Sequence, residues 1–363
     1  MPPEAVLPMQ EPAITTSLPE GRFERLPKWL NLVPMVLQWT WLGLRYGSFT
    51  LPSAANPGIT SGGLVGEGKL EYFAAMGPLA RAATADYLGV ETTPGLESGT
   101  LVQRMRADGL AFPIVAKPDI GWCGHGVRLL ADEGALAAYL RAYPVGETFL
   151  LQRYLPEPGE AGLFYMREPD AAQGVLIGIL LRDYPAVTGN GHDSIAQLIA
   201  ADPRLGRATD NARHECRYDP ARIPPAGEVV RLSTVASTRV GGCYRDGSAL
   251  ATPALLARVE AIARDMGQFL VGRFDVRYAG LEALRRGEFI IMEVNGAGSE
   301  AVHAWDPKYS IREVYQIVFA KQRLLFAIAD ANRRRGARPI SLRELARLWL
   351  RQRKLMRAYP PSN

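Results

Sequence analysis

The sequence predicts an α+β protein whose sheets are mainly antiparallel. Three observations lead to this fold class: short apolar runs rich in β-branched residues follow one another along the chain, single helical patterns separate them into groups, and a close pair of strands stands near the end. The sequence has neither a regular strand–helix–strand alternation nor an internal repeat. Its 363 residues are 47% hydrophobic, which is enough for roughly two or three packed domains.

Cysteine usage and the N-terminus indicate a cytoplasmic protein. Cys123, Cys216 and Cys243 form neither a CxxC pair nor an even framework, so we expect a reducing compartment and no structural zinc. No positively charged segment followed by an apolar run opens the chain, so we expect no signal peptide.

The net charge of +5 is concentrated in one terminal segment. Residues 333–357 hold ten Lys or Arg and one acid, Glu344, and without their +9 the remainder carries −4. The basic character therefore says little about the main body of the protein. Lysine is scarce, with six residues against 36 arginines, so a lysine inside an apolar segment stands out.

The first 68 residues form a segment without regular periodicity. Residues 1–27 are polar and proline-rich, and we expect a loosely ordered arm. Residues 29–44 hold three tryptophans and are too few to span a bilayer, so they predict a buried core helix or, alternatively, a helix lying at a membrane interface. Residues 48–68 predict a turn-rich loop, either a connector or a loop that positions substrate.

The other elements are predicted from periodicity and capping residues. Helices are expected at 69–88, at 132–143 with Asp132 as N-cap, from Thr252-Pro253 onward, at 311–331, and from Ser341, which forms a capping box with Glu344. Strands are expected at 111–117, 127–130, 148–155, 163–166, 175–181, 271–278 and 288–294.

One predicted strand near the end of the chain ends with two residues whose side chains carry oxygen atoms. Glu293 and Asn295 are two residues apart, so a strand places both on one face, and a glycine-rich turn at 296–300 follows. Asp275 lies 18 residues earlier in a second strand, and a hairpin would bring the three side chains together. Such oxygen ligands suit Mg²⁺, although a polar strand end before an ordinary glycine turn is the alternative.

A lysine and a glycine-rich loop supply the complementary charge. Lys117 ends an apolar strand, where an ammonium group needs an anion unless it reaches the surface. The loop that follows carries Gly121, Gly124 and Gly126, whose backbone N–H groups can approach phosphate oxygens closely. A plain hairpin turn is the alternative for this loop.

Taken together, these motifs resemble the ATP-grasp superfamily over roughly residues 69–318. The order and approximate spacing match at Ile114-Val-Ala-Lys117-Pro118, Gly121–Val127, Leu150-Leu-Gln-Arg-Tyr-Leu155, Phe274-Asp275 and Met292-Glu293-Val-Asn295-Gly296. Residues 186–199 look like the central part of the cyanophycin synthetase-like and D-alanine–D-alanine ligase-like members. The resemblance implies the ATP-grasp fold, in which two α+β subdomains clasp ATP between antiparallel sheets.

The resemblance also implies a role for each matching residue. Lys69 and Lys117 would bind the nucleotide phosphates, with Gly121, Gly124 and Gly126 closing over them. The adenine would lie against Gln152, where the family often has Glu, and against Tyr154 and Leu155, and Glu160 would hold the ribose. The metals would be held by Asp275, Glu293 and Asn295. Arg182 and Arg239 would stabilise charge on the reacting groups, unless they are surface arginines. Three histidines, His125, His192 and His303, are weaker candidates as bases.

The implied activity is an ATP- and Mg²⁺-dependent ligase that activates a carboxylate as an acyl phosphate and joins it to an amine. One or two Mg²⁺ ions would be held, with Mn²⁺ as a substitute. The alternatives are a phosphotransferase on the same fold and a non-catalytic nucleotide-binding protein associated with a membrane surface. The expected partners are small-molecule carboxylate and amine substrates rather than nucleic acid, and a homo-oligomer and a peripheral membrane contact stay open.

The resemblance divides the chain into three parts. Residues 1–68 would be an arm, a Trp-rich helix and a loop; residues 69–330 the ATP-grasp domain, with a small lid at about 111–150; and residues 331–363 a basic helix, packed on the domain or bound to an anionic surface. Family members commonly open with a βαβ domain that helps bind substrate, and residues 1–68 show no such pattern. The acceptor site is therefore unassigned, with Asn56, Gly62 and Gly63 only suggestive.

Overall fold

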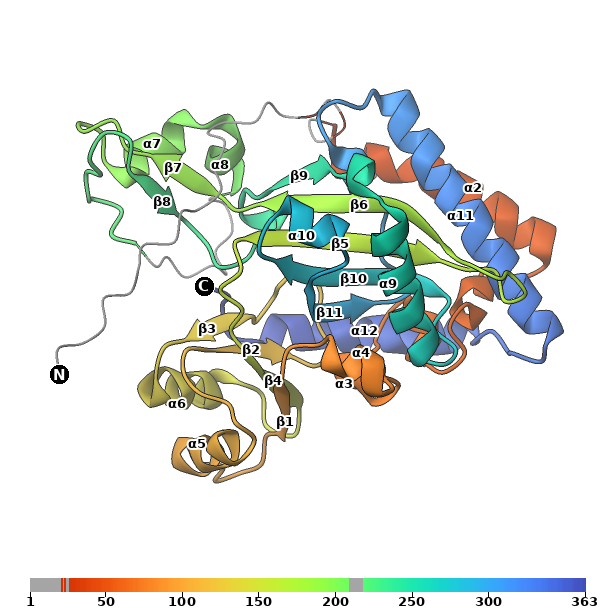
Figure 1. Cartoon of the computed structure of the whole chain (residues 1–363), viewed down its shortest axis with the longest axis horizontal. Helices are drawn as coiled ribbons and strands as arrows, with labels where there is room; N and C mark the ends of the chain where they lie inside the picture. The colour runs from red at the N-terminus through yellow and green to blue at the C-terminus, as the bar shows by residue number, and fades with distance from the viewer. Residues whose placement is uncertain (1–20, 22, 24–25, 209–217) are drawn as a thin grey trace.

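The computed structural model describes residues 21, 23, 26–208 and 218–363 (Figure 1). The arm expected at 1–27 lies almost wholly outside these residues, and Cys216 lies outside them too. Eleven strands form three sheets, and every ladder among the described strands is antiparallel, which confirms the predicted α+β class.

The strands divide into a central sheet, a smaller sheet and a two-stranded ribbon. The central sheet has the order β11 (Ile290–Asn295), β10 (Val271–Tyr278), β5 (Gly159–Met166), β6 (Val175–Asp183) and β9 (Cys243–Asp246). The smaller sheet has the order β1 (Tyr87–Glu91), β4 (Thr148–Arg153), β2 (Ile114–Pro118) and β3 (Arg128–Leu130). The ribbon pairs β7 (Ala186–Thr188) with β8 (Val229–Arg231).

The described α-helices are α2 (Lys28–Tyr46), α3 (Lys69–Ala74), α4 (Pro78–Ala82), α5 (Ser98–Ala107), α6 (Glu133–Ala142), α7 (Ile195–Ala201), α8 (Pro203–Ala208), α9 (Pro253–Asp265), α10 (Leu281–Arg285), α11 (Ile311–Arg334) and α12 (Leu342–Ala358). Short 3₁₀ helices lie at Leu51–Ala54, Thr60–Gly63, Thr238–Val240, Ser248–Leu250 and Val302–Trp305. Among the described helices, none combines the length and the apolar character needed to cross a membrane.

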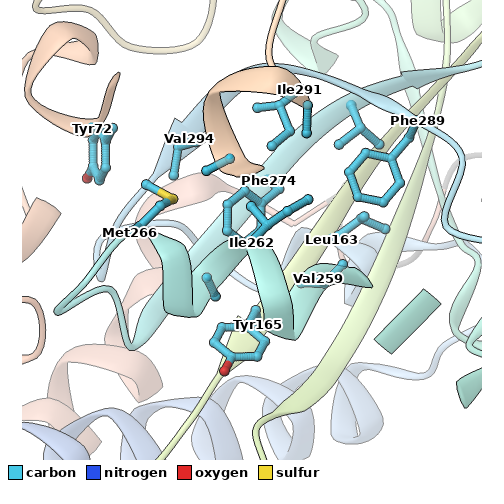
Figure 2. Close-up of a cluster of buried hydrophobic side chains, with 14 of the residues drawn as sticks. Tyr72, Leu163, Tyr165, Val259, Ile262, Met266, Phe274, Phe289, Ile291 and Val294 are labelled. Carbon is cyan, nitrogen blue, oxygen red and sulfur yellow. The ribbon is translucent and has the colours of Figure 1, made fainter. Parts of the chain in front are cut away.

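The central sheet is covered on one face by α9 (Figure 2). The Thr252 side chain accepts a hydrogen bond from the Leu255 N–H and so caps α9, as predicted from Thr252-Pro253. Val259 and Ile262 of α9 are buried against Phe274 of β10, in the same apolar cluster as Ile291 of β11. This packing holds β10 and β11 rigidly, and these two strands carry the predicted metal ligands.

The smaller sheet has its own core, to which the C-terminal segment contributes. Leu136 and Tyr139 of α6 are buried together with Phe149 of β4, and Leu355 and Tyr359 from the end of the chain join the same cluster. The basic helix expected from Ser341 is therefore packed on the protein: Ser341 caps α12, and the buried Leu355 anchors it. Figure 1 shows α12 running behind both sheets.

Helices α2 and α11 lie side by side on the far side of the central sheet (Figure 1). Gln38 donates a hydrogen bond to the Phe319 carbonyl at 2.9 Å, and Arg333 donates one to the Tyr46 carbonyl at 2.9 Å. The predicted helix at 29–44 is thus present, but the buried-core interpretation holds for one face only. The other face exposes large apolar side chains, including Trp29 and Trp41.

One prediction of secondary structure is wrong. The single helix expected at 69–88 is instead α3, α4 and the start of β1. Gly77-Pro78 separates the two helices, because proline cannot donate the backbone hydrogen bond that a continuous helix requires and fits instead at the start of α4. The predicted strands at 148–155, 175–181 and 271–278 correspond to β4, β6 and β10.

We expect Asn56→Ala to destabilise the protein by about 2–4 kcal/mol, because it leaves several buried backbone groups without partners. The fully buried Asn56 amide donates to the Gly62 and Val271 carbonyls and accepts from the Leu270 and Val271 N–H groups. Urea unfolding would measure the loss.

The matched control is Asn190→Ala. Asn190 also makes three hydrogen bonds through its side chain, but in an exposed loop, so this variant should lose less than about 1 kcal/mol. Equal losses in the two variants would contradict a special contribution from the buried amide.

Candidate active site

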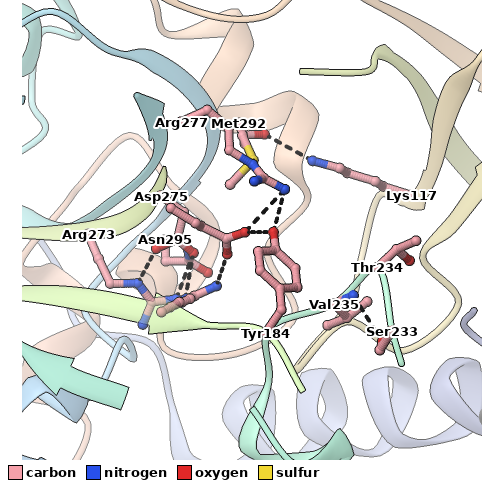
Figure 3. A network of polar contacts seen from close by, with 12 residues as sticks. Lys117, Tyr184, Ser233, Thr234, Val235, Arg273, Asp275, Arg277, Met292 and Asn295 are labelled. Atoms are coloured by element: carbon pink, nitrogen blue, oxygen red, sulfur yellow. Dashed lines mark hydrogen bonds and ion pairs between the residues drawn. The ribbon is translucent and has the colours of Figure 1, made fainter. Parts of the chain in front are cut away.

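The two large sheets meet where Lys117, at the end of β2, faces β11 (Figure 3). Lys117 Nζ donates to Gln152 Oε1 at 2.6 Å and to the Met292 carbonyl at 3.4 Å. Burial lowers the pKa of Lys117 to about 8, and the negative charge of Glu293 opposes this shift. The predicted phosphate-binding lysine therefore lies between the sheets and next to the predicted metal ligands.

Lys69 lies beside Lys117 from a different element. As the first residue of α3, it is 8% exposed, and its Nζ donates to the Pro118 carbonyl at 2.9 Å. The same atom lies 3.5 Å from Glu293 Oε1. A Cβ added at Gly121 would come within 3.3 Å of Lys69 Nζ, so the glycine-rich loop passes directly over this lysine.

Asp275 and Glu293 are cross-strand partners in the ladder between β10 and β11. The predicted hairpin thus brings together the residues expected to hold metal, and Asn295 donates its Nδ2 to Asp275 Oδ2 at 3.1 Å. The side chain of Glu293 is 31% exposed, whereas that of Asp275 is 4% exposed. Glu293 is therefore the more accessible of the two carboxylates.

Two arginines hold Asp275. Arg273 donates to both of its oxygens, at 2.6 and 2.9 Å, and Arg182 donates to Oδ2 at 3.2 Å. Burial favours the protonated acid, but the two arginines outweigh it and keep the pKa of Asp275 below its usual range. Asp275 is thus a charged carboxylate whose oxygens are already hydrogen-bonded by protein groups.

Arg182 joins Asp275 to a second buried carboxylate. Its Nη1 donates to Glu160 Oε1 at 2.9 Å, and Glu160 also meets the Tyr184 hydroxyl and, at 3.4 Å, Arg277 Nη2. Burial favours protonation of Glu160, but Arg277 and Arg182 lower its pKa. The predicted catalytic arginine and the predicted ribose ligand are therefore ion-pair partners.

Arg239 lies at a different place. Its Nε donates to the Cys123 carbonyl in the glycine-rich loop at 3.3 Å, and its Nη2 donates to Ser362 Oγ at 2.8 Å. The structure brings Arg182 next to Asp275, whereas Arg239 joins the loop to the C-terminal segment. Arg239 thus has contacts that would position the loop.

The glycine-rich loop needs its glycines for conformation and space. Gly124 and Gly126 have φ of 71° and 74°, a region that side chains other than glycine's rarely adopt. A Cβ at Gly124 would lie 2.7 Å from Val235, and one at Gly126 would lie 2.7 Å from Pro118. The loop is therefore held against Val235, which Figure 3 draws with Ser233 and Thr234.

The predicted adenine-binding residues lie at the end of β4 and directly after it. Gln152 is 2% exposed, and in addition to Lys117 it contacts the Ala85 carbonyl through Nε2 at 3.4 Å. Leu155 is buried, whereas Tyr154 is half-buried. Of the three, Gln152 is the one in contact with Lys117, and Tyr154 and Leu155 follow the end of β4.

The histidines are scattered. His303 is buried against Phe164, and burial lowers its pKa to about 4, so it is neutral at pH 7. His192 is exposed and lies 3.1 Å from Asp193. His125 lies within the glycine-rich loop, where its backbone N–H donates to the Trp122 carbonyl.

Five charged residues at or beside the site were not singled out from the sequence: Arg273 and Arg277, described above, and Lys321, Glu300 and Glu67. Lys321 of α11 donates to the Ala297 carbonyl at 3.0 Å, and burial lowers its pKa to about 8 against the opposing charge of Glu300. Burial raises the pKa of Glu67 to about 7, in the neighbourhood of Lys69. The scarcity of lysine was the available signal for Lys321, because it interrupts an apolar helix.

The loop at 48–68 packs against the turn that follows Asn295. The Ala297 and Gly298 N–H groups donate to the Gly62 and Gly63 carbonyls at 3.1 and 2.7 Å. Asn56, whose side-chain hydrogen bonds all go to the backbone, anchors this loop to β10. Of the three residues suggested for acceptor binding, Asn56 thus has structural contacts, while Gly62 and Gly63 border the turn.

The donor set at this site suits Mg²⁺ in part. Within the described ranges, no three His, Cys, Asp or Glu side chains are grouped so as to hold a metal. Glu293, with its exposed carboxylate, and Asn295 fit a cation that keeps several waters and phosphate oxygens as ligands. Asp275 would have to exchange a hydrogen bond from Arg182 or Arg273 to join them.

The solved structures that this chain resembles include a synthetase and two ligases. One is a bifunctional glutathione synthetase from Pasteurella multocida, at 16% identity and a TM-score of 0.34, over 70% of this chain and 36% of that chain. A D-alanine–D-alanine ligase from Bacillus anthracis matches at 15% and 0.38, over 74% and 67% of the two chains. The VanG D-Ala:D-Ser ligase from Enterococcus faecalis matches at 12% and 0.41, over 73% and 62%.

No family model matches the chain, and no curated protein matches it in sequence. At these low identities and TM-scores, the function has to be argued from the residues of the site.

We expect Gly63→Ala to destabilise the protein by about 2–4 kcal/mol. Gly63 has a φ of 79°, and an added Cβ would lie 2.3 Å from the Tyr72 hydroxyl and 2.5 Å from Gly296 Cα. Urea unfolding would measure the loss.

Gly58→Ala in the same loop is the control, because its added Cβ meets nothing within 4 Å and its φ is not positive. This variant should stay within about 0.5 kcal/mol of the parent protein. A harmless Gly63→Ala would mean that the loop and the turn do not pack as closely as the structure shows.

Proposed function

We propose that this protein is an ATP- and Mg²⁺-dependent ligase that joins a carboxylate to an amine. The observation that carries the proposal is the arrangement between the two sheets, where Lys69 and Lys117 face the carboxylates of Asp275 and Glu293. Two cations opposite two anions suit a metal–polyphosphate complex, which carries charge of both signs. The resemblance of the motifs to the ATP-grasp superfamily supports the same conclusion.

In this proposal the two lysines hold the nucleotide phosphates. Lys117 would exchange its bond to Gln152 for a phosphate oxygen, and Lys69 would act from under the loop at Gly121. Backbone N–H groups around Gly124 would contact the terminal phosphates. Gln152, Tyr154 and Leu155 would line the adenine, and Glu160 would contact the ribose by releasing one of its present partners.

Glu293 and Asn295 would hold Mg²⁺, with Asp275 as the third ligand or as the group that orients the Asn295 amide. When bound, Mg²⁺ neutralises charge on the transferring phosphoryl group. Arg182 and Arg273 already stand next to these ligands and would offset negative charge that develops during the transfer.

The proposed reaction has two balanced steps. A carboxylate oxygen of the first substrate attacks the γ-phosphorus, and the bond from that phosphorus to the β–γ bridging oxygen breaks to release ADP. The amine nitrogen of the second substrate then attacks the acyl carbon, inorganic phosphate leaves, and the nitrogen loses a proton. The protein contributes orientation and electrostatic stabilisation rather than a covalent intermediate.

We expect Lys117→Met to weaken ATP binding by about 10- to 100-fold, because it removes a charge-assisted contact to phosphate. Titration with a fluorescent ATP analogue in the presence of Mg²⁺ would measure the change. Lys354→Met is the control, because Lys354 is exposed on α12 and should leave the affinity unchanged. Unchanged binding in the Lys117 variant would contradict the proposed phosphate site.

The reaction itself is tested by accounting for phosphate. A screen of carboxylates with and without amines should find a pair that releases ADP and free phosphate in equal amounts. Glu293→Gln should raise the Mg²⁺ concentration for half-maximal rate at least about tenfold, whereas Glu288→Gln, at an exposed position just before β11, should not. Phosphate found on the product instead of free would make the protein a phosphotransferase.

A further inference from the structure

A cavity of about 240 Å³ lies beside the turn that follows Asn295, between α2 and α11. Apolar groups make up most of its wall, with Trp39 of α2 and Trp305 on opposite elements and Val318 of α11 among the rest. A cavity of roughly 150 Å³ lined by apolar groups already accepts benzene. This cavity therefore has room for an aromatic ring or a short aliphatic chain.

Two charged side chains line the cavity, Lys321 and Glu300. The Lys321 ammonium is largely buried, and its hydrogen bond goes to the carbonyl of Ala297, two residues beyond Asn295. Glu300 is exposed, so water screens its charge. Of the two charges, Lys321 thus gains more from an anionic partner inside the cavity.

Two cavity-lining residues of α2 are also exposed to solvent. Leu32 and Val36 line the cavity and are also 50% and 57% exposed, so they belong to both surfaces. Leu37 and Leu44, which are 65% and 68% exposed, do not line the cavity and lie about 80–100° around the helix from Val36. An apolar chain too long for the cavity would therefore leave past Leu32 and Val36, on a stretch of α2 without a charged side chain before Arg45.

We infer that this cavity binds an amphiphilic carboxylate, an aliphatic monocarboxylate whose head group pairs with Lys321 and whose chain leaves along α2. The head group would then lie beside Ala297, on the turn that begins at the proposed metal site. The assignment of this carboxylate as the group that becomes an acyl phosphate rests on the proposed function. The binding of the carboxylate does not.

The test measures by calorimetry how tightly the full-length protein, without nucleotide, binds a series of sodium alkanoates that runs from butanoate to decanoate. Affinity should rise about fourfold for each added methylene while the chain still gains apolar contacts. Lys321→Met should weaken octanoate binding by at least about tenfold, through loss of a charge-assisted contact. Octylamine should bind more weakly than octanoate.

A matched pair of variants on α2 separates the cavity from its surroundings. Val36→Asp places a carboxylate at the mouth of the cavity and should weaken octanoate binding by about tenfold or more. Val33→Asp makes the same substitution at another exposed valine of the same helix. Val33 does not line the cavity, so the affinity for octanoate should stay within about twofold of that of the parent protein. Both valines are exposed, so neither variant has to repack a core.

Equal weakening by the two α2 variants would show that octanoate binds to the apolar face in general, and would overturn the inference. Tighter binding of octylamine than of octanoate would mean that Glu300, rather than Lys321, pairs with the head group, and would overturn the inference as well. Chain-length-dependent binding without ADP release, in the presence of ATP and amines, would leave the cavity site standing and count against the ligase. ADP release with short polar carboxylates, without any binding of alkanoates, would support the ligase and overturn the cavity site.

Discussion

The buried ion pairs around Asp275 and Glu160 are the interaction on which the rest of the structure depends. Three adjacent strands, β5, β6 and β10, supply the carboxylates and the arginines, and Arg182 bridges the two acids. A carboxylate buried without a partner would be costly, and removing one partner of such a pair typically costs about 3–5 kcal/mol. The central sheet can therefore place charge in its interior only in this mutually paired form. Glu293 and Asn295 take their positions from the adjacent strand.

The second sheet completes the site by contributing cations. Lys117 reaches across to the backbone of β11, and Lys69 reaches Glu293 from the start of α3. Among the described contacts, Lys117 has no carboxylate partner on its own sheet, and the carboxylate that Lys69 of α3 meets is Glu293 of β11, so both charges are balanced where the two sheets meet. A ligand that carries both phosphate and metal would satisfy both sides at once. This is the basis of the proposal that the site binds a nucleotide–metal complex.

The N-terminal segment is tied to the same site. Asn56 fixes the loop at 48–68 to β10, the Gly62 and Gly63 carbonyls hold the turn after Asn295, and α2 closes a cavity beside that turn. The segment thus occupies the place where a substrate can approach the proposed phosphate site. It does so with a loop and one helix, and the largely apolar lining of the cavity is the basis of the inference that it takes an apolar group.

The sequence by itself determined the local structure and the composition of the site. Apolar runs rich in β-branched residues predicted β10 and β6, capping residues predicted the starts of α9 and α12, and strand geometry placed Glu293 and Asn295 on one face, because these signals act over a few residues. The break at Gly77-Pro78 was readable in principle and was outweighed by apolar periodicity. Only the tertiary structure decided that Arg182 pairs with Asp275 while Arg239 does not, and that Lys321 reaches the turn from α11. Those contacts join residues that are 24 to 116 positions apart in the sequence. The partner of a charged side chain could therefore not be predicted from its neighbours in the chain, because it depends on which strands and helices pack together.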